Sequence, residues 1–97
     1  MDKNKVANDL KEIKYYYTHK EFFESSYNIT GVNKVHKLVE KYNEAICNAD
    51  PQLHELYVLM YIQGNSWEVV SAIKPCSMDY VFRHHRRLIE FFQKSIA

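Results

Sequence analysis

The chain contains only two glycines and two prolines in 97 residues, and these four residues constrain its fold more than any other feature. Gly31, Pro51, Gly64 and Pro75 divide the sequence into pieces of helical length, because glycine and proline interrupt regular structure. No segment shows the strict alternation of apolar and polar residues that is typical of a strand. The sequence therefore predicts a single all-α domain of about five helices over residues 1–97.

Apolar residues recur at helical spacing within these pieces, as Val6, Leu10, Ile13 and Tyr17 do near the start. The third piece is apolar on nearly every side, which predicts that it forms the central and most buried helix. The predicted helices cover about residues 2–25, 32–48, 51–63, 67–73 and 77–94.

Polar residues occupy the positions where these helices should begin. Asp50 before Pro51 is a good helix start, because an N-cap side chain is followed by proline at the first helical position. Gly64 suits the left-handed conformation that often ends a helix. The candidate N-cap residues are Thr30 or Asn33, Asp50, Ser66 and Ser77.

The C-terminal segment, residues 64–92, has the pattern of a helix-turn-helix with a turn near Pro75 and a basic second helix. The arginines of the chain are Arg83, Arg86 and Arg87. At about 100° per residue they fall opposite an apolar face that includes Val81 and Leu88. This division predicts a recognition helix over residues 77–94 that binds duplex DNA in the major groove.

Side chains near the start of a recognition helix reach base edges first, and those farther along contact phosphates. We therefore expect Asp79, Tyr80 and Arg83 to contact bases, and Arg86 and Arg87 to contact phosphates. An ordinary solvated surface is the alternative, although Arg83 and Arg87 are a like-charged pair on adjacent turns. The candidate DNA-binding residues are Ser66, Lys74, Ser77, Met78, Asp79, Tyr80, Arg83, Arg86 and Arg87.

Aromatic residues of the first helix are more numerous than one helix face can bury, because several are consecutive. They indicate a surface that binds a second copy of the chain or another protein. A homodimer is expected, since a two-fold symmetric DNA site is normally bound by two copies. Residues 1–48 would then dimerise and residues 50–97 would bind DNA. The alternative for the aromatic residues is an exposed tyrosine face that binds no partner. The candidate interface residues are Tyr15, Tyr16, Phe22, Phe23 and Phe91.

Other classes of function have little support. The sequence offers no paired acid and base and no glycine-rich phosphate loop, so we predict neither an enzyme nor a cofactor. Cys76, His84 and His85 lack the spacing of metal ligands, and Trp67 is expected to pack in the core. No apolar run is long enough to span a membrane, and the start lacks a signal-peptide segment. The two cysteines do not make a disulfide framework, so a cytoplasmic protein with reduced thiols is expected. The net charge of +1 gives no overall bias toward nucleic acid.

Part of the chain resembles a known family. The segment GNSWEVV, residues 64–70, followed by Ser77 and Val81, resembles the helix-turn-helix in the fourth region of sigma factors. The closer similarity, over residues 56–92, is to small sigma-like phage regulators of the ArpU type. The matching motifs are Tyr61-Ile62, Ser66-Trp67, Ser77-x-x-x-Val81 and Arg86-Arg87-Leu88-Ile89. The chain departs from the family pattern at two places. Val69-Val70-Ser71 stands where the family usually has Glu-Ile-Ala, and Lys74 replaces an expected apolar residue.

The resemblance implies a transcriptional regulator of phage or mobile-element origin that binds double-stranded DNA. A protein-interaction module is the alternative, because the net charge is small and the first helix is aromatic. Such a module would bind RNA polymerase or another regulator and inhibit or redirect it. A DNA-recognition subunit of a packaging machine is a third interpretation.

Overall fold

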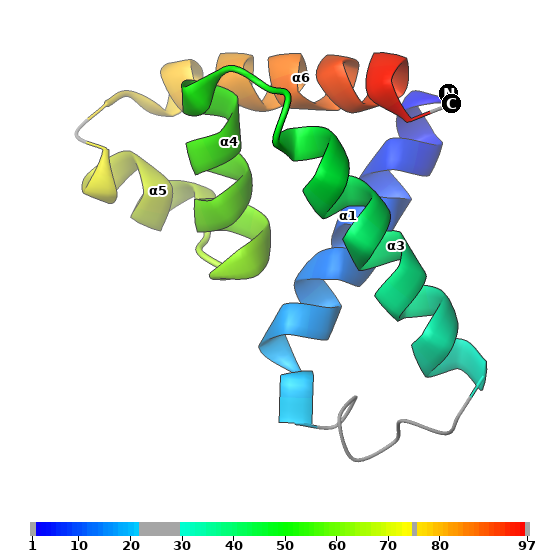
Figure 1. Ribbon diagram of the computed structural model, residues 1–97. Helices are drawn as coiled ribbons and strands as arrows, with labels where there is room; N and C mark the ends of the chain where they lie inside the picture. Colours follow the sequence, from blue (N-terminus) through cyan, green and yellow to red (C-terminus); the bar gives the residue numbers. More distant parts are fainter. Residues whose placement is uncertain (1, 22–29, 75, 97) are drawn as a thin grey trace.

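The computed structural model describes residues 2–21, 30–74 and 76–96, and regular structure in these residues is entirely helical. Figure 1 shows α6 lying across one end of the molecule, with the end of α6 beside the start of α1. The helices are α1 (Lys3–Thr18), α3 (Thr30–Ile46), α4 (Pro51–Tyr57) continuing into η1 (Val58–Ile62), α5 (Trp67–Ile73) and α6 (Met78–Ser95). The prediction of an all-α fold with about five helices is confirmed.

The first two helices differ from their predicted bounds. α1 ends at Thr18 rather than near residue 25, because the backbone of His19, with φ of −125° and ψ of 36°, leaves the helical conformation. Residues 22–25 of the predicted helix lie outside the described residues. α3 begins at Thr30 and ends at Ile46, two residues earlier than predicted at each end. The side chains of its candidate caps, Thr30 and Asn33, also lie outside the described part.

Three predicted N-caps are confirmed by their hydrogen bonds. Asp50 accepts from the backbone N–H of Gln52, and Pro51 is at the start of α4. The Ser66 hydroxyl accepts from Val69 N, and the Ser77 hydroxyl accepts from Tyr80 N. Each bond satisfies an N–H that has no partner within the first helical turn.

Gly64 separates η1 from α5 in the left-handed conformation that the sequence predicts, with φ of +74°. A Cβ atom at this position would also lie 2.9 Å from Cγ2 of Thr18 in α1. The backbone angle therefore favours glycine, and a side chain here would in addition displace the Thr18 methyl group.

The end of the third helix differs from the regular helix that we predicted. Val58–Ile62 forms a π turn, in which the backbone N–H of Gln63 donates to the Val58 carbonyl at 2.9 Å. A π turn has more residues per turn than an α-helix, so consecutive side chains spread over less of the circumference. Three consecutive apolar residues, Leu59, Met60 and Tyr61, are all buried as a result.

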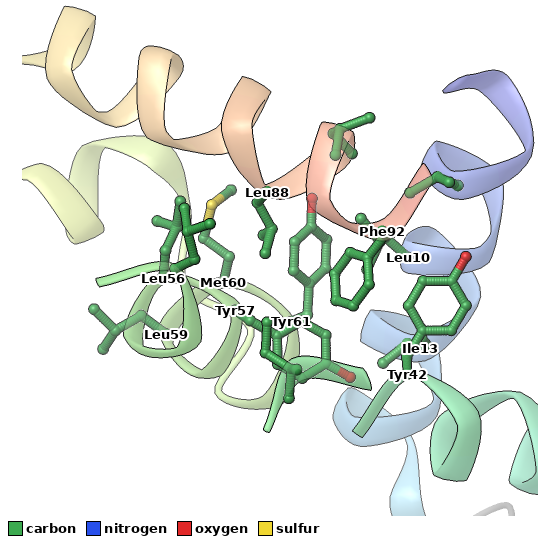
Figure 2. Packing of buried hydrophobic residues seen from close by; sticks show 14 of the residues in the cluster. Leu10, Ile13, Tyr42, Leu56, Tyr57, Leu59, Met60, Tyr61, Leu88 and Phe92 are labelled. Carbon is green, nitrogen blue, oxygen red and sulfur yellow. The ribbon is translucent and has the colours of Figure 1, made fainter. Parts of the chain in front are cut away.

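α4 and η1 together form the central helix of the fold, as predicted, since they contact α1, α3, α5 and α6. Figure 2 shows aromatic rings filling the space between these helices. The ring of Phe92 lies 4.7 Å from that of Tyr42 and 5.7 Å from that of Tyr57, between ring centroids. All three side chains are fully buried. This cluster holds α6 against α3 and α4.

A buried hydrogen bond ties α1 to α3. Tyr42 donates its hydroxyl to the carboxylate of Asp9 at 2.8 Å, and Lys5 forms an ion pair with the same carboxylate at 3.0 Å. Burial raises the pKa of the Tyr42 phenol, so the hydroxyl keeps the proton that it donates. Because a buried carboxylate must be hydrogen-bonded, this contact selects one arrangement of the two helices.

Candidate nucleic-acid interface

The rotation of α6 about its axis is set by four buried apolar side chains, Val81, Leu88, Ile89 and Phe92. They match the packed face that the helical spacing predicts. His85, which helical spacing predicts on this face, and Met78, predicted beside it, are half-buried. The opposite side of the helix therefore faces away from the core.

This outer side carries every arginine of the chain, and all three are exposed. Asp79 is exposed in the first turn, where the helix dipole favours an acid. Tyr80 is 37% exposed beside it. Glu90, also exposed, follows Arg86 by one turn. The arginines thus form a short basic surface with an acid at each end.

Two of the predicted phosphate-binding cations form ion pairs with acids of the central helix and its cap. The ammonium group of Lys74 lies 2.8 and 2.9 Å from the two carboxylate oxygens of Glu55. This hydrogen bond raises the pKa of Lys74 and keeps it charged. The guanidinium of Arg87 lies 3.7 Å from the carboxylate of Asp50. All four side chains are about half exposed, so water and salt screen both pairs.

Arg83 and Arg86 differ from Arg87, which forms an ion pair with Asp50. Within the described residues neither forms an ion pair, although both project from the same helix. They carry full positive charge on the outer surface of α6. An external anion can reach them without displacing an acid of the protein.

Trp67, at the start of α5, packs partly against the core, as predicted. Its ring centroid lies 4.8 Å from that of Phe82 and 4.6 Å from that of His85. Phe82 is 47% exposed and lies next to the arginines, although it was not among the predicted interface residues. The signal was available, because Phe82 falls about 100° away from Val81 on the helix and so off the buried face.

His85 belongs to a neutral aromatic cluster behind the basic surface. Its Nε2 is hydrogen-bonded to the hydroxyl of Tyr61 in η1. Burial lowers the pKa of His85 to about 4 and raises the pKa of Tyr61 to about 12. Both groups are uncharged at neutral pH, so this cluster adds no charge to the basic surface of α6.

A small pocket of about 90 Å³ lies between α4, α5 and the start of α6. Leu56, Val70 and Val81 contribute to its apolar part, while Tyr80 and His84 lie on the side of α6. Its volume is that of about three water molecules in the liquid. Known small-molecule sites measure roughly 300 Å³ or more, so this pocket offers little room for a ligand.

The aromatic residues proposed for an interface fall into different environments. Tyr15 is 53% exposed and stacks on His19, at 4.1 Å between ring centroids. Tyr16 and Phe91 are half-buried and pack partly against the core. Phe22 and Phe23 lie outside the described residues. Of the set, Tyr15 is therefore the side chain that the structure places most openly on the surface.

Over residues 2–21, 30–74 and 76–96, histidines, cysteines and acids do not gather into a group of three that could hold a metal ion. Cys47 and Cys76 are free thiols. In the same part of the chain, every helix is too short or too polar to cross a membrane.

Comparisons of this chain with protein-family models, with curated proteins and with solved structures find no match. The interpretation of the interface consequently depends on its own geometry and charge.

Proposed function

We propose that this protein is a sequence-specific DNA-binding regulator of transcription, with α6 in the major groove of duplex DNA. The observation that carries the proposal is the pair of exposed arginines, Arg83 and Arg86, on a helix whose other side is buried. Within the described residues, neither arginine has an acidic partner. A guanidinium donates two parallel hydrogen bonds to guanine or to phosphate, so both side chains suit this role.

The place of each side chain along α6 determines whether it would contact bases or phosphates. Asp79, Tyr80 and Arg83 lie near the start of the helix and would contact base edges, together with Ser77 and Met78. Arg86 and Arg87 lie farther along and would contact phosphates. Lys74 and Ser66, at the end and start of α5, would contact the backbone on either side.

Two of these cations would exchange partners on binding. Lys74 would leave Glu55 and Arg87 would leave Asp50 for phosphates of the duplex. Exposed ion pairs are weak and screened, so the exchange costs little. Each phosphate contact releases counterions, and duplex affinity should therefore fall steeply as salt rises.

A homodimer on a two-fold symmetric site is part of this proposal. The exposed ring of Tyr15, with the half-buried Tyr16 and Phe91, would supply aromatic surface to a second copy. The proposed origin in a phage or mobile element depends on the resemblance of residues 56–92 to sigma-like phage regulators of the ArpU type.

The test is selection of bound sequences from a pool of random duplexes, followed by affinity measurements on the selected duplex. Arg83→Ala should cost about 1–3 kcal/mol of binding free energy and relax the selected sequence at one position. Lys41→Ala removes an exposed cation of α3 and serves as the matched control. If Arg83→Ala binds the selected duplex as tightly as the control does, α6 does not read DNA through this face.

A second candidate function has one specific observation in its favour. The outer side of α5 carries two exposed apolar side chains, Val69 and Ile73, which are exposed by 44% and 49%. An apolar helix face is typical of a protein interface, so α5 could bind RNA polymerase or another regulator. That binding should persist at high salt and in Arg83→Ala, and it should be lost in Ile73→Lys. A pull-down of purified RNA polymerase with these variants separates the two functions.

A further inference from the structure

A second basic feature lies beside α6, in an open groove of about 250 Å³ between the start of α1, the start of α5 and the middle of α6. Lys3 of α1 and Arg86 of α6 both line it. The described residues that line this groove include no acid. Two like charges at one groove repel each other, and an anion bound there removes that repulsion.

The groove that these cations line also has an aromatic surface. Trp67, Phe82 and His85 line it, and the Trp67 ring is within 5 Å of both other rings. Phe82 is 47% exposed, so part of its ring is open to a ligand. A ligand that matches the groove has an apolar part flanked by negative charges. The sugar-phosphate backbone of DNA has this composition, since a deoxyribose separates each pair of phosphates.

The position of the groove favours a duplex over a free phosphate ion. Arg86 follows Arg83 by one helical turn, so the groove adjoins the surface that would contact bases. When a helix enters the major groove, the two DNA backbones border it on either side. One backbone would then pass the side of α6 on which Lys3 and Trp67 lie.

We propose that this groove binds the backbone of one DNA strand, with Lys3 and Arg86 on neighbouring phosphates and the intervening sugar against Trp67 and Phe82. The inference rests on the proposed function and extends the interface from the helix-turn-helix to α1. It also gives the first helix a direct role in binding, in addition to its packing on η1 and α6.

The test measures affinity for the selected duplex over a series of salt concentrations, for the wild type, Lys3→Gln, Arg86→Gln and the double variant. Each phosphate contact contributes about 0.9 to the slope of log affinity against log salt. Each single variant should therefore lower the slope by about 0.9, and the double variant by about twice that. Lys41→Gln, on α3, is the control and should keep the wild-type slope. Lys3 is exposed at the first position of α1, so its replacement leaves the core intact.

Trp67 provides a second readout, because it is the only tryptophan of the chain. Its fluorescence should change when duplex is added, and the change should persist in Arg83→Ala at saturating duplex. Lys3→Gln should weaken binding to all sequences equally and leave the selected motif unaltered.

The two proposals fail in different ways. If the wild type binds duplex but Lys3→Gln keeps the wild-type slope, the groove is not a backbone site and the proposed function stands. If the wild type binds no duplex at any salt concentration, the proposed function fails and the groove site fails with it. A slope change in Lys3→Gln that Lys41→Gln also shows would mean a general effect of charge, and would overturn the site.

Discussion

Acidification should weaken this fold through His85, which packs against Trp67 of α5 and is hydrogen-bonded to Tyr61 of η1. Burial lowers the pKa of His85 to about 4 from its ordinary value of 6.5. The folded state thus favours the neutral ring, whereas the unfolded chain takes up a proton near pH 6.5.

The sign and size of the effect follow from proton linkage. Because the pKa is lower in the folded state, the stabilising contribution is present above pH 6.5 and is lost as the pH falls toward 4. With these two pKa values, the loss between pH 7 and pH 5 is about 2 kcal/mol. Below pH 4 the loss from this residue reaches a limit of about 3 kcal/mol.

Urea unfolding followed by circular dichroism at pH 7 and pH 5 measures this loss. His85→Gln keeps a hydrogen-bonding group for Tyr61 but does not titrate, so its unfolding free energy should fall by about 2 kcal/mol less than that of the wild type. The other titrating groups are common to both proteins and cancel. His54→Gln, at an exposed histidine of α4, should behave like the wild type. Equal losses in His85→Gln and the wild type would refute the reasoning.

Three further predictions concern the core and the ion pairs. Phe92→Ala should cost about 3–5 kcal/mol in urea unfolding, because it empties a fully buried space beside Tyr42. Tyr42→Phe should cost about 1–3 kcal/mol, seen as a lower thermal midpoint, because the buried Asp9 carboxylate loses a donor. Glu55→Gln should leave stability nearly unchanged but raise duplex affinity in anisotropy titrations, because Lys74 becomes available to phosphate. Duplex affinity that is unchanged in both Glu55→Gln and Lys74→Gln would remove Lys74 from the interface.

The helices were predictable because their starts depend on neighbours in the chain. The side chains of Asp50, Ser66 and Ser77 accept from backbone N–H groups two or three residues away. Gly64 likewise takes its left-handed conformation at the end of one helix. Such contacts are local, so residue type and spacing are sufficient to place them.

The candidate site was only partly predictable. Helical spacing correctly placed the arginines opposite Val81 and Leu88, since one buried face determines the exposed one. The same spacing puts Phe82 about 100° from Val81 and off the buried face, yet Phe82 was left out of the predicted interface, where its ring is half exposed. The predicted end of α1 was wrong. The apolar pattern of the sequence continues past Thr18, whereas the backbone leaves the helical conformation at His19.

The sequence by itself determined that the chain is all-helical, where most helices begin, and which side of α6 faces outward, because these depend on contacts within a few residues. Only the tertiary structure decided which charges meet. Lys74 forms an ion pair with Glu55, which is 19 residues away in the sequence, and Arg87 forms one with Asp50, the N-cap residue of α4. Lys3 and Arg86, from opposite ends of the chain, line one groove. These pairs depend on how the helices pack around Tyr57 and Phe92, and no local pattern encodes that packing.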